Sequence, residues 1–423
     1  MNSEGFGKGL KAFGGEFAPT LRLLLRQRRK VWVRVVSFAV LAIVTAGLAQ
    51  LVAPLIPSAW TVKIGAEAVD QVLSILASSM LAVTTFSLAI AISAFSAAAS
   101  TATPRATALL QEDPTAQNVL ATFLGAFLFS LVGIIALQAG YFDSAGRLVL
   151  FVVTAAVIAL VVLALLRWIS HLMTFGRMGD TLDRVEAAAI KSLENRLKNP
   201  FLGGRPLLSG IPTSCRPLIS SEAGYVVHVD VGKLDSVAES LKIKVWLNAL
   251  AGSFVHQAGP LLHVEREIND DEALQRLRTA FTIGAERSFE QDPRFGLIVI
   301  SEIASRALSP AVNDPGTAIS VVGRLVRILA RWNDNPEAKI HYESVFVPGV
   351  EPADLIVDSF RAIVRDGAST VEVQLRVQKA LHALAEIAPG VFADPASDMA
   401  ADAMSRAQNA LTENEFRLLE QQA

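Results

Sequence analysis

Four stretches of this sequence contain no Asp, Glu, Lys, Arg or His over 19 to 27 residues, and this feature constrains the fold most. They are residues 35–56, 72–98, 119–140 and 148–166. A helix rises about 1.5 Å per residue, so each stretch can cross the roughly 30 Å hydrocarbon core of a bilayer. We predict a four-helix transmembrane domain over residues 35–166. A cleaved signal peptide is the alternative for the first stretch, but its apolar run is longer than such peptides use.

Basic residues flank the outer ends of this domain. Arg167 and Arg177 follow the last stretch, and a basic leader, residues 1–34, precedes the first. The bases nearest the first stretch are Arg26, Arg28, Arg29 and Lys30. Because bases are retained on the cytoplasmic side, we expect both termini in the cytoplasm. The leader either contacts the anionic inner leaflet of the bilayer or only fixes the topology.

The second stretch differs from the others in being rich in Ala, Ser and Thr. At 100° per residue, one narrow face of this helix carries Ser74, Ser78, Thr85, Ala89, Ile92 and Ser96. Small and hydroxylated residues allow helices to pack closely, which is one interpretation of this face. The other is a water-lined path with Ile92 as a dewetting gate. Both interpretations remain open.

No predicted span contains an ionisable residue. Coupled transporters, intramembrane proteases and voltage sensors usually place charges at membrane depth, so these classes are disfavoured. Any conduction path would have to form between copies of the chain, and we therefore expect a homo-oligomer.

The rest of the chain reads as a water-soluble region. Only 18% of all residues are charged, but residues 167–423 are acidic and approach the usual fraction of about one quarter. We expect an amphipathic connecting helix over 167–200, a small β-module over 205–266 and an α-helical subdomain over 267–423. The predicted fold class is therefore membrane α-helical, followed by an α+β region.

The least ordinary soluble segment is Arg306 to Ala318, RALSPAVNDPGTA. Asp314 before Pro315 is typical of a helix N-cap followed by a first-turn proline. Alternatively, Ser309, Asn313 and Asp314 belong to a ligand site that includes Asp292 or Arg294. The sequence leaves this choice open.

The sequence gives little indication of metal binding, of a disulfide or of catalysis. His228, His256 and His263 lack the spacing of a metal site, and a single cysteine, Cys215, excludes an internal disulfide. Phosphate loops, nucleophile elbows and zinc-protease motifs are absent, which disfavours an enzyme without deciding the point. We expect no cofactor, no metal and no nucleic-acid partner.

Several segments carry a resemblance to a known family. They are Phe86-Ser87, Pro104-Arg105, the turn from Gly252 to Leu262, Glu290-Gln291-Asp292-Pro293 and, above all, Ala307-Leu308-Ser309-Pro310-Ala311-Val312-Asn313-Asp314-Pro315. The chain resembles the bacterial predicted inner-membrane protein family of unknown function called domain of unknown function twenty-two fifty-four. The resemblance implies an integral inner-membrane protein with a cytoplasmic tail, and it supplies no activity or site.

Two functions are compatible with these observations. The first is an oligomeric channel or pore, with the second helix lining the path and the cytoplasmic region assembling or gating it. The alternative is a non-conducting membrane-anchored scaffold or sensor, whose cytoplasmic tail binds a ligand or partner.

Overall fold

The computed structural model describes residues 31–52, 66–111, 113–332 and 338–422. The chain divides into two compact units. The first, here called the helical-hairpin unit, comprises residues up to 97 and residues 110–177; the second, the soluble unit, comprises residues 98–109 and 178 onward. The leader with Arg26, Arg28, Arg29 and Lys30 lies outside the described residues.

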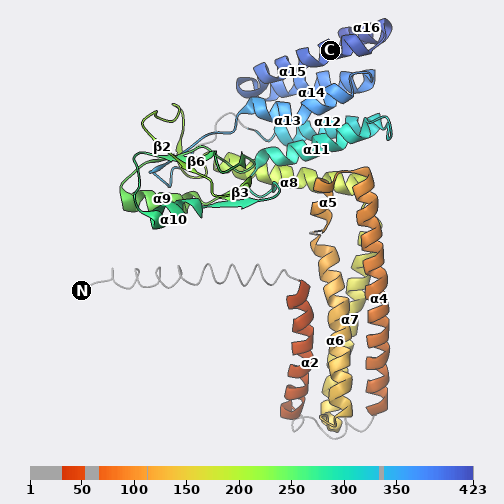
Figure 1. The fold of residues 1–423 in the computed structure, drawn as a ribbon. Helices are drawn as coiled ribbons and strands as arrows, with labels where there is room; N and C mark the ends of the chain where they lie inside the picture. Colours follow the sequence, from red (N-terminus) through yellow and green to blue (C-terminus); the bar gives the residue numbers. More distant parts are fainter. Residues whose placement is uncertain (1–30, 53–65, 112, 333–337, 423) are drawn as a thin grey trace, which may run out of the picture. The chain divides into compact units, whose positions relative to one another are not determined.

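Within the described residues, the helical-hairpin unit has four helices long and apolar enough to span a membrane. They are α2 (Val31–Val52), α4 (Ala66–Thr101), α6 (Pro114–Gln138) and α7 (Ser144–Leu172) (Figure 1). The four predicted apolar helices are thereby confirmed, with residues 53–56 of the first outside the described part. Charged residues such as Glu67, Arg147 and Arg167 continue the helices beyond the uncharged stretches.

Local sequence explains where α6 and α7 begin. The Asp113 side chain accepts a hydrogen bond from the backbone N–H of Ala116 at 2.6 Å, and Pro114 occupies the first helical turn. Asp143 does the same for Gly146 at 2.7 Å. Each aspartate satisfies an N–H group that has no partner inside its own helix.

Helix α2 packs against α6 and α7. Helix α6 approaches α2 closely at Gly125, where an added Cβ would lie 2.4 Å from Cδ2 of Phe38. Phe123 and Phe129 of α6 are fully buried. The small residue at 125 therefore lets the aromatic ring of α2 rest directly on the α6 backbone, as small residues do between membrane helices.

The soluble unit contains a helical part whose buried residues form one hydrophobic core. Its helices are α5 (Pro104–Gln111), α8 (Met178–Lys198), α11 (Pro293–Ala307), α12 (Pro315–Leu329), α13 (Pro352–Asp366), α14 (Val371–Ile387), α15 (Pro389–Ala410) and α16 (Glu413–Gln422). Helix α11 packs on α8, α12 and α13. It is thus at the centre of this part (Figure 1).

The same unit contains two sheets. The five-stranded sheet has the order β1-β8-β4-β6-β2, and the three-stranded sheet has the order β5-β3-β7. The first comprises β1 (Arg205–Pro206), β8 (Val345–Val347), β4 (Val245–Leu247), β6 (Pro260–Val264) and β2 (Arg216–Ile219); the second comprises β5 (Phe254–Val255), β3 (Gly224–Val229) and β7 (Phe281–Gly284). Helices α9 (Val231–Leu241) and α10 (Asp271–Arg278) complete this part.

Two strands lie in the range 267–423 that we expected to be helical. Strand β7 pairs with β3 in antiparallel register, with Val226 opposite Ile283. Strand β8 pairs in parallel with β4, with Trp246 opposite Phe346. The expectation of a purely helical segment after residue 266 was wrong because both strands are short and gain their hydrogen bonds from partners distant in sequence.

Candidate functional site

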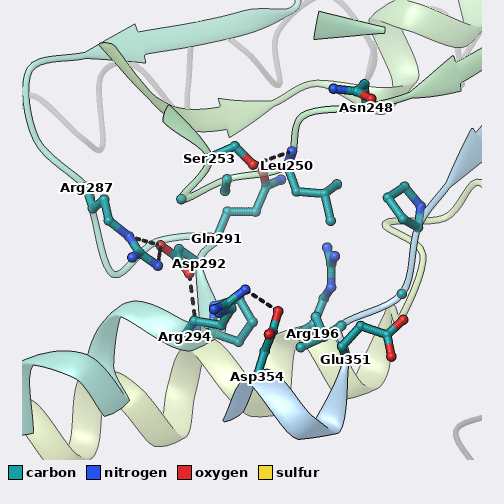
Figure 2. Close-up of a pocket in the computed structure, with 16 residues that line it drawn as sticks. Arg196, Asn248, Leu250, Ser253, Arg287, Gln291, Asp292, Arg294, Glu351 and Asp354 are labelled. Atoms are coloured by element: carbon teal, nitrogen blue, oxygen red, sulfur yellow. Dashed lines mark hydrogen bonds and ion pairs between the residues drawn. The ribbon is translucent and has the colours of Figure 1, made fainter. Parts of the chain in front are cut away.

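A cavity of about 280 Å³ lies in the soluble unit. Three segments converge on it: residues 248–253 between β4 and β5, residues 287–294 at the start of α11, and residues 348–354 from the end of β8 into the first turn of α13. Arg196, in the last turn of α8, completes the lining. Small-molecule sites are typically concave, partly apolar pockets of about 300–1,000 Å³. At about 280 Å³, this cavity is close to the lower end of that range, which suits a small metabolite. Figure 2 shows the residues that line it.

Asp292 organises one side of the cavity. It is 1% exposed and caps α11 by accepting hydrogen bonds from the N–H groups of Arg294 (3.1 Å) and Phe295 (3.2 Å). Its Oδ2 also lies 2.7 Å from Nη2 of Arg287. Burial raises the pKa of Asp292, and Arg287 offsets this only in part. The side chain is therefore fully engaged in positioning α11.

Gly252 leaves room for the Asp292 carboxylate beside its backbone. Its φ of +95° lies in the region that favours glycine, and an added Cβ would lie 2.3 Å from Oδ2 of Asp292. The backbone N–H of Gly252 donates to the carbonyl of Val226 at 2.8 Å. The Gly252 turn and Asp292, both in segments that carry the family resemblance, thus meet in space.

Gln291 and Arg294 anchor the start of α11 on both sides. The Gln291 amide accepts a hydrogen bond from Val229 N at 2.8 Å and donates to Val229 O at 3.1 Å. Arg294 pairs with Asp358 (2.6 Å) and Asp354 (2.5 Å) of α13. Burial lowers the pKa of Arg294, but these ion pairs outweigh it and raise the pKa above its ordinary value. The Arg294 charge is therefore neutralised within the protein.

Arg196 differs from the other arginines of the cavity. It is 5% exposed, and its Nε is buried without a hydrogen-bond partner. Figure 2 shows its guanidinium in the space below Leu250, apart from the ion pairs marked by dashed lines. Burial lowers the pKa of Arg196 to about 10, and the attraction of Asp292 counters this only partly. The group remains protonated at neutral pH.

Sequence reasoning missed Arg196, although it left a signal. Residues Val185, Ala189 and Leu193 recur at helical spacing and are fully buried, and Arg196 follows Leu193 by three residues on the same face. An arginine that continues the apolar face of a helix is an unusual position, because arginines are almost never fully buried unless paired. This position distinguishes it from the surface bases of the same helix.

The predicted site residues fall into two groups. Asp292 and Arg294 line the cavity. Ser309, Asn313 and Asp314 lie beyond the other end of α11, a helix of 15 residues and therefore about 22 Å long. The proposed meeting of Asn313 and Asp314 with Asp292 or Arg294 was wrong, because α11 holds the two motifs apart.

The second motif has the geometry of a turn between helices. Asn313 has a φ of +50°, and Asp314 accepts a hydrogen bond from Thr317 N at 3.0 Å. That hydrogen bond, with the Thr317 hydroxyl, lowers the pKa of Asp314. The N-cap interpretation of Asp314 therefore accounts for its contacts, while a ligand role for Ser309, Asn313 and Asp314 stays a prediction.

The candidate pore-lining face of α4 is exposed on the single chain. This applies to Ser74, Ser78, Thr85, Ala89, Ile92 and Ser96. The Ser78 hydroxyl donates to the carbonyl of Ser74 at 2.9 Å, and the Thr85 hydroxyl donates to that of Leu81 at 2.9 Å. These hydroxyls are satisfied within their own helix, so they are compatible with water, lipid or a second helix.

The end of α4 and α5 up to residue 109 belong to the soluble unit. Ala102 and Ala106 are fully buried in the same core as Val299 and Ile303 of α11. Arg105 forms an ion pair with Glu302, and Arg306 donates to the carbonyl of Ser100 at 2.6 Å. One face of α11 therefore holds residues 98–109, here called the α4–α5 segment.

In the described part of the chain, no three His, Cys, Asp or Glu side chains are grouped to hold a metal ion. His263 has a pKa lowered by burial. The polar side chains that line the cavity are arginines, carboxylates, amides and the hydroxyl of Ser253.

Comparisons with known proteins agree with the sequence resemblance. The chain is 30% identical over 219 residues to the Uncharacterized protein Mb1321c of Mycobacterium bovis and to the Uncharacterized protein Rv1290c of Mycobacterium tuberculosis. Each alignment covers 49% of this chain and 42% of the relative, so the match spans less than half of those proteins. No solved structure matches the chain. The model of the family described as Predicted membrane protein (DUF2254) matches residues 28–383, and the chain therefore belongs to this family.

Proposed function

We propose that this membrane protein is a ligand-responsive sensor. Binding of a small molecule to the soluble unit changes the position of the end of α4. The observation that carries the proposal is the position of α11. Its first turn lines the cavity through Pro293 and Arg294, and its last turns hold the α4–α5 segment through Glu302 and Arg306. A ligand that shifts the start of α11 would therefore displace the end of α4.

The proposal requires a rigid connection between the two ends of α11. Residues Leu297, Val299, Ile300 and Ile303 of this helix are fully buried. Close-packed interiors transmit displacement because they deform little. Helix α4 is continuous from Ala66 to Thr101, so its end in the soluble unit and its apolar length form one element.

The proposed topology places both termini and the soluble unit in the cytoplasm, at the bacterial inner membrane. The support is the excess of bases before the first span and after the last. In the same arrangement, Arg26, Arg28, Arg29 and Lys30 of the leader would contact the anionic inner leaflet.

Hydrogen–deuterium exchange on the full chain in detergent tests the sensor proposal. Small molecules that co-purify with the protein are removed and added back, and exchange is followed at residues 287–294 and 98–109. We expect added ligand to protect both regions. Ala251→Phe, which fills the cavity, should abolish both effects, while Ala258→Phe, at an exposed position of the same part, should not. Protection of residues 287–294 alone would refute the coupling.

Arg306→Ala combined with Glu302→Gln isolates the coupling step. These changes remove the hydrogen bond to Ser100 and the ion pair to Arg105. The ligand should still protect the cavity, but its effect on residues 98–109 should disappear. A ligand effect there that persists in the double variant would contradict the proposed route.

An oligomeric channel is the second candidate, and the exposed polar face of α4 favours it. In a homo-oligomer this face could line a path between copies, with Ile92 as a gate. Flux through liposomes containing the wild type is compared with flux for Ser78→Leu plus Thr85→Leu. We expect the variant to block a pore; equal flux in both, or no flux in either, counts against a channel.

A further inference from the structure

Arg196 is a buried cation whose partner is missing from the described residues. It takes part in no ion pair or side-chain hydrogen bond there, although it is 5% exposed and its Nε is fully enclosed. Buried charges are expensive unless they are paired, and buried polar groups without partners are rare in native proteins. The geometry therefore calls for a binding partner supplied from outside the chain.

Among the described residues, no carboxylate of the cavity forms an ion pair with Arg196, although Asp292 attracts it from a distance. Asp292 forms an ion pair with Arg287 and accepts a hydrogen bond from the first turn of α11. Asp354 forms an ion pair with Arg294. In Figure 2 both of these ion pairs are drawn, and the Arg196 guanidinium points into the space between Leu250 and the start of α13. Arg196 is thus a positive charge aimed at the cavity.

A second feature adds positive potential at the same place. Helix α13 begins at Pro352, and its N-cap residue, Glu351, makes no side-chain capping hydrogen bond. The N-terminus of a helix carries a partial positive charge that stabilises anions. Both Glu351 and Pro348 line the cavity, so the helix start faces its interior.

The same lining limits the charge of the ligand. The carboxylates of Glu351 and Asp354 border the cavity, and they would repel a dianion more strongly than a monoanion. A guanidinium forms two parallel hydrogen bonds with a carboxylate. Leu250, Pro293, Pro348 and Val350 supply apolar contacts for the remainder of a small molecule.

We propose that the cavity binds a small molecule through a singly charged carboxylate, which pairs with Arg196. This proposal names the ligand class of the sensor function above and rests on it. In the bound state the carboxylate supplies the missing partner of the guanidinium. The apolar groups of the cavity contact the body of the ligand.

A pair of matched probes tests the ligand class. Binding of 4-fluorobenzoate and of its neutral analogue 4-fluorobenzamide to the full chain in detergent is measured by fluorine NMR line broadening. We expect the benzoate to bind and the benzamide to bind at least about tenfold more weakly, as for the loss of a hydrogen bond to a charged group. Sulfate, a dianion, should compete poorly.

Two substitutions assign the binding to Arg196. Arg196→Met should weaken benzoate binding by about tenfold or more, while Arg196→Lys, which keeps the charge, should retain part of it. Unfolding temperatures are measured to check that both variants fold. Equal line broadening in wild type and Arg196→Met, or no benzoate binding to the wild type, overturns the proposal.

The outcomes also separate this proposal from the sensor function. If benzoate does not bind but a co-purified molecule protects residues 287–294, the carboxylate assignment fails and the sensor proposal stands. If benzoate binds at Arg196 without affecting residues 98–109, the carboxylate site stands and the coupling to α4 fails. Effective competition by sulfate would overturn the preference for a monoanion.

Discussion

Replacing Arg196 with methionine should make the ligand-free protein more stable. The substitution keeps an unbranched chain and removes the charge. Burial lowers the pKa of Arg196 to about 10, and at about 1.36 kcal/mol per pKa unit the departure from the ordinary pKa of an arginine corresponds to roughly 3 kcal/mol. We expect Arg196→Met to raise the free energy of unfolding at pH 7 by up to that amount.

The sign of this change in the free energy of unfolding follows from the protonation equilibrium of Arg196. Because the folded state has the lower pKa, it binds the proton less strongly than the unfolded chain does. The cost of the charged group is therefore present in full below pH 10, and it is lost progressively as the pH rises from there toward the ordinary pKa of an arginine. The advantage of Arg196→Met over the wild type should persist across the neutral range.

Thermal unfolding of the full chain in detergent, without added ligand, measures this effect. A change of about 1 kcal/mol shifts the midpoint by roughly 2–4 °C in a unit of 150–250 residues, so a rise of several degrees is expected. Arg324→Met is the control, because Arg324 lies 2.5 Å from Glu186 and 2.6 Å from Asp183. It should lower the midpoint. A lower midpoint for Arg196→Met as well would show that Arg196 has a structural partner and would refute the reasoning.

Three further substitutions test separate contacts. Gly252→Ala places a Cβ 2.3 Å from Oδ2 of Asp292 at a φ of +95°, and it should lower the free energy of unfolding by roughly 2 kcal/mol or more. The control is Gly323→Ala, whose Cβ meets nothing within 4 Å and which should not lower the free energy of unfolding. Asp314→Ala should cost about 0.5–2 kcal/mol through the lost cap, yet leave 4-fluorobenzoate binding unchanged; weaker binding would assign Asp314 to a ligand site. Gly125→Ala should lower the unfolding midpoint by crowding the Phe38 ring, and Phe38→Ala in the same chain should restore part of the loss; additive effects would contradict this contact.

The membrane helices could be predicted from sequence because one local property defines them. An uncharged run of sufficient length has few alternatives, and all four runs lie on helices as far as the structure describes them. Their ends could not be predicted so well. Helix α7 continues to Leu172 and includes Arg147 and Arg167, because a charged side chain near the end of a helix does not stop it.

The sheets were only partly predictable. Strands β3, β4 and β6 lie within residues 205–266, where the sequence predicted a β-module. Strand β8 has three residues, and it lies in the sheet because of parallel pairing with β4, about 100 residues earlier. Such pairing depends on the tertiary fold, and no local pattern reports it.

The candidate site, like the sheets, could be predicted from the sequence only in part. Asp292 and Arg294 were named from the sequence as candidate site residues, and both line the cavity. The meeting of Asp292 with Gly252 and Arg196 brings together α11, a turn of the sheet part and the end of α8. Whether an arginine has a partner depends on groups from all of these elements, so the unpaired state of Arg196 became visible only in the fold.

Helix α11 explains why two motifs in one stretch of sequence have different roles. Asp292 caps its start beside the cavity, and Asp314 caps the next helix after a turn that ends α11. Both motifs fix the length and position of this helix between the cavity and the α4–α5 segment. Changes at either end should therefore alter stability and coupling, but only changes at the Asp292 end should alter ligand binding directly. This asymmetry distinguishes a sensor that acts through α11 from a site formed by the two motifs together.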